Sequence, residues 1–293
     1  CYPYEGQWSD RLTRALSTGF PVAIEQDLAW GNGQPVVSHS KDLKGGEPTL
    51  RQHFFEAVRP VVEKALRDNQ RQDWPLIVLH FDFKDNRREL LEAVWKLLGE
   101  YEPWISTAPK TAEPSSLQPI SVGPLLVLTE DNDAQEDVFF TSLPTGAKLR
   151  LFGSAHTAAV NATSLAERAH LAATLPPDQL LTDRPTNYRR WWNNSWALVE
   201  EGGQQRAGAW TSQDDSRLRA LVDHAHRLGF WIRFYTLDGF TAAQNRGWDQ
   251  GYNFGSLEAA TLRWHAALAA GVNLIATDQY EDLAREMKKE NAQ

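Results

Sequence analysis

Segments patterned as buried strands alternate with segments patterned as amphipathic helices along most of the 293-residue chain, and this alternation constrains the fold more than any other feature. The expected strands cover residues 21–30, 75–84, 124–130, 147–155, 188–198, 230–239 and 272–278. The helical segments between them include residues 50–68, 87–99, 216–229 and 255–271. Strands and helices in strict rotation form parallel βαβ units, and seven or eight such units favour a closed (β/α)8 TIM barrel. We therefore predict an α/β fold with a single domain that spans residues 1–293.

The N-terminal end of the predicted barrel is one strand short. A short extended piece at residues 34–40 follows the strand at 21–30 too closely to be the next parallel strand, because a parallel crossover needs about a dozen residues or more. We therefore expect the first barrel strand to lie at or just before Cys1.

Two of the expected helices begin with capping patterns. Thr49 and Gln52 have the spacing of a capping box before the helix at 50–68, and Asn86 and Glu89 have it before the next helix. Pro60 lies inside the first of these helices, where we expect a bend or an interruption.

Composition excludes several classes of protein. Lys and Arg number 30 against 38 Asp and Glu, a formal net charge of −8, whereas a broad nucleic-acid surface needs clustered basic residues. No apolar run approaches the roughly 18 residues that span a membrane, so we expect no transmembrane segment. The single cysteine, Cys1, allows no intrachain disulfide.

Polar side chains gather at the carboxyl ends of the predicted strands, where (β/α)8 barrels carry their active sites. Glu25 and Asp27 lie two residues apart, so the period of a strand turns both to the same side. His80, Asp82 and Lys84 share one face of the next strand, and we expect His80 to support the site rather than act as a base. Neighbouring carboxylates are costly unless they have a partner, which leaves a metal ion, a basic side chain or water. An internal salt bridge between Asp82 and Lys84 is the simplest structural explanation of that pair.

Five motifs follow one another over nearly the whole chain: "AIEQDLAW", "PVVSHS", "HFDFK", "FYTLDG" and "GVNLIATDQY". In order and spacing they resemble the phospholipase C-like phosphodiesterase superfamily, especially the glycerophosphodiester phosphodiesterases. The resemblance implies a (β/α)8 barrel in which Glu25, Asp27 and Asp82 bind a divalent cation, His39 is a catalytic acid/base and Lys84 binds phosphate. Aspartate at position 82, where many of these phosphodiesterases have glutamate, is similar to the sphingomyelinase D branch.

Two departures from this family pattern bear on activity. Members of the family carry a first catalytic His at the end of the first strand, and no His precedes His39 here. Its place falls immediately before "CYPYEG", and we expect that the sequence starts just after it. The second His of the family is usually followed by Asp, whereas Ser40 follows His39. A weakened or inactive relative is therefore an alternative to an active enzyme.

The chemistry of these residues agrees with the roles that the resemblance implies. Three carboxylates make an all-oxygen site that suits Mg²⁺ or Ca²⁺ and is poor for zinc. A cation and Lys84 would neutralise charge on phosphoryl oxygens, and His39 would protonate the leaving oxygen. The resemblance therefore implies a metal-dependent phosphoric diester hydrolase that acts on a small phosphodiester or a phospholipid-type substrate, with a role in lipid metabolism and a secreted or periplasmic location. Arg233 and Tyr235 share a face of the strand at 230–239 and are expected to contact the substrate.

Two other functions stay open at this point. A barrel glycosidase needs two carboxyl groups about 5–9 Å apart, and Asp82 with Glu130 could supply them, although His39 and Lys84 would then have no role. A barrel that binds a ligand or carbohydrate without turnover is favoured if the first His is absent from the protein. The tryptophan-rich stretch "RRWWNNSW" fits a mouth that contacts sugar or lipid but more simply fits the core.

Overall fold

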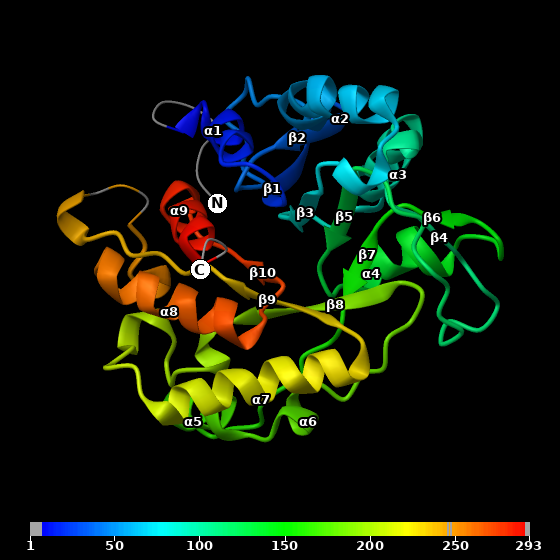
Figure 1. Cartoon of the computed structure of the whole chain (residues 1–293). Helices are drawn as coiled ribbons and strands as arrows, with labels where there is room; N and C mark the ends of the chain where they lie inside the picture. The colour runs from blue at the N-terminus through cyan, green and yellow to red at the C-terminus, as the bar shows by residue number, and fades with distance from the viewer. Residues whose placement is uncertain (1–7, 245, 247, 291–293) are drawn as a thin grey trace. The chain divides into compact units, whose positions relative to one another are not determined.

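The structure of the chain is a computed structural model that describes residues 8–244, 246 and 248–290. The chain divides into two compact units. Unit 1 comprises Cys1–Ser154 and Thr186–Arg189, and unit 2 comprises Ala155–Pro185 and Arg190–Gln293. Each unit combines parallel strands with helices, so the α/β class holds in both (Figure 1).

The strands of unit 1 form a mostly parallel sheet in the order β2-β1-β3-β5-β7. Their bounds are β1 Val22–Gly31, β2 Gln34–Val37, β3 Ile77–Phe83, β5 Leu125–Thr129 and β7 Phe152–Ser154. Strand β2 pairs with β1 as an antiparallel hairpin partner, which agrees with the spacing argument that it is not the next parallel strand. A separate antiparallel pair joins β4 (Ala108–Pro109) to β6 (Lys148–Leu149).

The helices of unit 1 connect these strands in chain order. They are α1 Arg11–Ser17, η2 Arg51–Phe55, α2 Glu56–Asp68, η3 Arg71–Asp73, α3 Arg88–Glu100, η4 Glu102–Trp104, α4 Asp133–Glu136 and η5 Asp137–Thr141. Pro60 lies inside α2 and does not interrupt it, so the expected interruption is wrong. The π-helical turn η2 lies directly upstream of α2. Pro60 removes one backbone hydrogen bond and crowds the turn before it, which is the turn next to η2.

One predicted helix cap is present in unit 1 and the other is wrong. The amide of Gln52 donates to Thr49 Oγ1 at 3.1 Å, and the amide of Thr49 donates to Gln52 Oε1 at 3.4 Å. Helix α3 instead begins after Arg87, which makes no side-chain capping bond. The side chain of Asn86 accepts a hydrogen bond from Gln135 Nε2 at 2.7 Å, so a distant partner has replaced the local one.

The described residues of unit 2 form three parallel strands in the order β8-β9-β10. Their bounds are β8 Arg189–Ser195, whose first residue belongs to unit 1, β9 Trp231–Tyr235 and β10 Leu274–Ile275. The helices are α5 Leu165–Thr174, α6 Pro177–Leu180, η6 Trp196–Leu198, η7 Gln204–Arg206, α7 Ser212–Leu228, η8 Ala242–Gln244, η9 Gln250–Tyr252, α8 Leu257–Ala270 and α9 Tyr280–Glu290.

Tryptophans occupy the core of unit 2 rather than an open mouth. Trp192, Trp196 and Trp264 are fully buried together with Phe234 and aliphatic side chains from α7 and α8. Trp191 is fully buried as well. The "RRWWNNSW" stretch is therefore part of the packed interior, which removes this observation from the case for a sugar-binding mouth.

The closed barrel and the single domain over residues 1–293 stay predictions. The first strand, expected at or before Cys1, lies outside the described residues. Across residues 8–244, 246 and 248–290, none of the helices combines the length and the apolar character that crossing a membrane requires.

Candidate functional site

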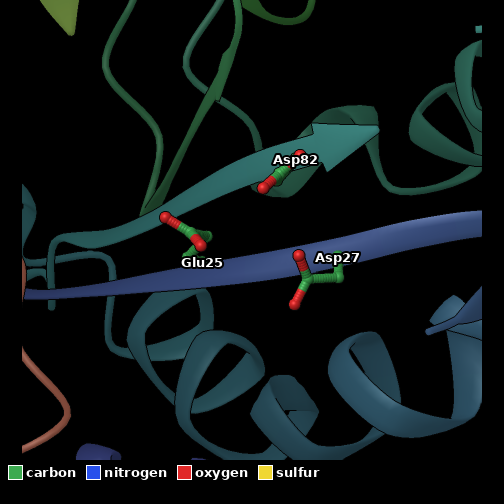
Figure 2. A group of neighbouring side chains, drawn as sticks. All are labelled: Glu25, Asp27 and Asp82. Atoms are coloured by element: carbon green, nitrogen blue, oxygen red, sulfur yellow. The ribbon is translucent and has the colours of Figure 1, made fainter. Parts of the chain in front are cut away.

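The pairing of β1 with β3 brings three carboxylates of unit 1 together. The two strands run parallel, with Asp27 opposite Asp82 and Glu25 opposite His80. Because the strand period is two, Glu25, Asp27 and Asp82 project from the same face of the sheet. One carboxylate oxygen from each of the three residues lies within 4.8 Å of the other two. Figure 2 shows the three side chains, which come from these two neighbouring strands.

Lys84 supplies a positive charge to two of these carboxylates. Its Nζ lies 2.9 Å from Asp27 Oδ1 and 2.6 Å from Asp82 Oδ2, and its backbone amide donates to the Leu28 carbonyl at 2.8 Å. Burial alone would lower the pKa of Lys84, but the charges of Asp27 and Asp82 outweigh it and raise this pKa. Burial raises the pKa of Asp82, with Lys84 opposing the rise and the charges of Asp27 and Glu25 adding to it. The salt bridge expected between Asp82 and Lys84 is present, and it extends to Asp27.

The three carboxylates also meet the requirements of a hard divalent cation. Two ligands on opposite sides of an ion, each about 2.0–2.6 Å from it, stand about 4–5 Å apart, and the oxygens of the triad lie within 4.8 Å of one another. Asp27 is buried, while Glu25 and Asp82 are partly exposed, so an ion has a route to the site from solvent. An all-oxygen donor set of this kind suits Mg²⁺ or Ca²⁺. Glu25, Asp27 and Asp82 would hold the ion.

His80 links the triad to a fourth carboxylate. Its Nδ1 lies 3.4 Å from Glu25 Oε2, and its Nε2 lies 2.7 Å from Glu130 Oε1. Glu130 directly follows β5 and projects from the same face as Leu128, which pairs with His80 across β3 and β5. The sequence places Glu130 at the carboxyl end of a predicted strand, and the one role predicted for it is that of a glycosidase carboxylate. The alternation of Leu128 and Glu130 along the strand predicts only that their side chains share a face, and the register of β5 against β3 then places Glu130 beside His80.

His39 lies on the loop that follows β2, outside the cluster of carboxylates. The amide of Ser38 donates to the Asp27 carbonyl at 3.3 Å, which ties the start of the loop to strand β1. A Cβ at Gly31 would lie 2.5 Å from Leu43 Cδ1, so this glycine makes room for Leu43 to pack onto the strand. His39 itself is exposed, and across the described residues its side chain makes no hydrogen bond or ion pair with the triad. Its catalytic role stays a prediction.

Arg233 and Tyr235 belong to unit 2. The Arg233 side chain is buried, donates to Asn193 Oδ1 at 2.9 Å and places its guanidinium carbon 5.6 Å from the centre of the Tyr235 ring. Substrate contacts by these two residues stay predictions, because the carboxylate cluster is built from unit 1 alone.

Unit 2 also contains a buried acid close to its C-terminal strand. Asp238 is fully buried, and its Oδ1 accepts hydrogen bonds from Thr277 Oγ1 and from the Asp278 amide, each at 2.7 Å. Burial raises the pKa of Asp238 to about 8, and the charge of Asp278 adds to the rise.

Comparisons with known proteins give only distant structural similarity. No family model matches the sequence, and no curated protein matches it. A glycerophosphoryl diester phosphodiesterase from Parabacteroides distasonis is 11% identical, with a TM-score of 0.41 over 94% of this chain and 79% of that chain. A triple mutant of Plasmodium falciparum HPPK-DHPS is 10% identical, with a TM-score of 0.45 over 97% of this chain and 44% of that chain. An HPPK-DHPS in complex with substrates is 11% identical, with a TM-score of 0.44 over 98% of this chain and 46% of that chain.

The chain thus spans less than half the length of these HPPK-DHPS chains. At such identities and TM-scores, the similarity establishes neither the fold family nor the activity of this protein.

Proposed function

We propose that the chain is a divalent-metal-dependent phosphoric diester hydrolase that acts on a small phosphodiester or a phospholipid-type substrate. One observation carries this proposal: Glu25, Asp27 and Asp82 bring their oxygens within 4.8 Å of one another, with the Lys84 ammonium on the same group of oxygens. Hard cations and phosphoryl oxygens are the ligands that such a mixed cluster would attract. The motif resemblance to glycerophosphodiester phosphodiesterases points the same way.

Each residue of the cluster has a role in this chemistry. When bound, the cation acts as a Lewis acid that stabilises charge on the phosphoryl oxygens. Lys84 holds a second positive charge beside Asp27 and Asp82, where it would attract and orient an anionic diester. His39, exposed on the loop that is tied to β1, would donate a proton to the leaving oxygen. The glycosidase alternative gives Lys84 no such role.

The proposal is tested by ion binding and hydrolysis measured on the same purified chain. We expect one Mg²⁺ or Ca²⁺ site by isothermal titration calorimetry and hydrolysis of bis(p-nitrophenyl) phosphate that stops in chelator and returns with the ion. Asp27→Asn keeps the side-chain volume but removes a charged ligand, so binding should weaken by about tenfold or more. Glu89→Gln, an exposed change on α3, is the matched control and should leave binding unchanged.

Two results would count against the proposal. Full hydrolysis in excess chelator would remove the metal from the mechanism. Ion binding that depends on Asp27, together with no hydrolysis of any diester, would support the alternative of a barrel that binds a ligand without turnover.

A further inference from the structure

We propose that His80 and Glu130 act as a positioning pair for the metal ligand Glu25. In this arrangement Glu130 fixes the imidazole ring, and the ring in turn fixes the Glu25 carboxylate. The inference rests on the proposed function, because it takes Glu25 as a ligand of the ion.

The register of three neighbouring strands creates the arrangement. His80 on β3 stands opposite Glu25 on β1 and opposite Leu128 on β5. Glu130 comes two residues after Leu128 and therefore projects from the same face. The ring lies between the two carboxylates, with Nδ1 3.4 Å from Glu25 Oε2 and Nε2 2.7 Å from Glu130 Oε1.

Burial makes the ring a fixed support. The His80 side chain is 4% exposed, whereas those of Glu25 and Glu130 are 24% and 31% exposed. Its strand neighbours Leu79 and Phe81 are fully buried. A buried imidazole cannot replace its protein partners with water, so the nearby carboxylates of Glu25 and Glu130 restrict where it sits.

The members of the triad are supported in different ways. Asp27 and Asp82 both contact the Lys84 ammonium, whereas Glu25 contacts His80. Glu25 also has the longer side chain and loses more rotamer freedom when it binds an ion. Holding its carboxylate in advance would therefore raise ion affinity, and partners of this kind typically change metal affinity by about 10–100-fold.

Two substitutions of His80 separate positioning from simple filling of the interior. Asparagine carries its amide nitrogen near the position of Nδ1, which faces Glu25, and glutamine carries its amide nitrogen near the position of Nε2, which faces Glu130. We expect His80→Asn, which keeps a nitrogen facing Glu25 but loses the contact with Glu130, to bind Mn²⁺ about tenfold more weakly than the wild type, and His80→Gln to bind it about 100-fold more weakly. The readout is the free Mn²⁺ signal in electron paramagnetic resonance titrations of the full chain, with thermal unfolding measured beside it.

Glu130→Gln provides a second test that does not change a buried residue. This variant keeps the side-chain volume and should weaken Mn²⁺ binding by about tenfold, because the ring loses its charged partner. Asp131→Asn is the matched control: Asp131 is the next residue along the chain, and its carboxylate contacts Arg189 at 3.1 Å. That control should leave Mn²⁺ binding unchanged.

The outcomes distinguish this inference from the proposed function. Wild-type binding that is sensitive to Glu25→Gln but insensitive to His80→Gln and Glu130→Gln would overturn the positioning pair and leave the metal site standing. Equal weakening of Mn²⁺ binding by His80→Asn and His80→Gln would also overturn it, because the nitrogen that faces Glu25 would then contribute nothing to the ion affinity. A wild-type chain that binds no Mn²⁺ would overturn the metal site and the inference together.

Discussion

The ammonium nitrogen of Lys84 lies 2.9 Å from Asp27 Oδ1, so a fixed positive charge already contacts an oxygen that we assign to the divalent ion. The same nitrogen lies 2.6 Å from Asp82 Oδ2. A bound ion would therefore share the negative charge of these two aspartates with Lys84. Removing Lys84 therefore tests whether the lysine competes with the ion for these aspartates.

Lys84→Met should strengthen ion binding while it weakens catalysis. The substitution removes a positive charge from the carboxylate cluster, so the affinity for Mg²⁺ or Ca²⁺ should rise by about tenfold, as measured by titration calorimetry. Turnover of a diester should fall by about 10², because the transition state loses a cation. Lys96→Met, an exposed change on α3, is the control. Weaker ion binding in Lys84→Met would mean that Lys84 holds the aspartates in place rather than competing for them.

His39→Ala should lower turnover without changing stability. Because His39 is exposed, thermal unfolding should stay at the wild-type temperature. Hydrolysis of an alkyl diester should fall by about 10²–10⁴, and hydrolysis of a nitrophenyl diester should fall less because its leaving group needs no proton. His170→Ala, an exposed change in unit 2, should affect neither substrate. Equal losses on both substrates would argue against a proton donor.

Asp238→Asn should flatten the pH dependence of stability. The pKa of Asp238 is raised from 3.8 to about 8, so between these values the folded chain keeps a proton that the unfolded chain has released. The free energy of unfolding of the wild type should therefore fall as the pH rises from about 4 to about 8. Asparagine keeps the acceptor for Thr277 and the Asp278 amide and carries no charge.

Urea unfolding followed by tryptophan fluorescence at pH 5 and pH 8 checks this prediction. Relative to the wild type, Asp238→Asn should gain on the order of 1 kcal/mol or more at the higher pH. Asp223→Asn, an exposed change on α7, should show no such gain. A parallel response of Asp238→Asn and wild type would show that Asp238 is charged in the folded state.

The sequence predicts most strands but not where each one finds its partner. The apolar runs at 21–30 and 75–84 become β1 and β3 because each is long enough to cross a buried sheet. The run at 147–155 is divided, with β6 paired to β4 and β7 paired to β5. Arg150 separates the two pieces, with its guanidinium carbon 4.6 Å from the centre of the Trp95 ring. Contacts between residues so far apart in the chain leave no trace in a local pattern.

The same limit applies to the candidate site. The side-chain period of two and the parallel pairing of neighbouring strands are enough to predict that Asp27 and Asp82 lie together. The first rule holds within any strand, and the second is general to parallel sheets. The contact between His80 and Glu130 depends on the register between β3 and β5, which the sequence does not state. His39 lies on a loop, where no periodicity fixes the direction of a side chain.

The register of β1 against β3 has a consequence for changes of chain length. A one-residue insertion between Val22 and Glu25, with the pairing kept upstream, would turn both carboxylates of β1 to the opposite face of the sheet while Asp82 stayed where it is. Insertions in the loop at residues 38–49 would leave that pairing intact. Changes of chain length within β1 or β3 would therefore dismantle the carboxylate cluster, whereas changes in the loop at residues 38–49 would displace His39 and leave the cluster in place.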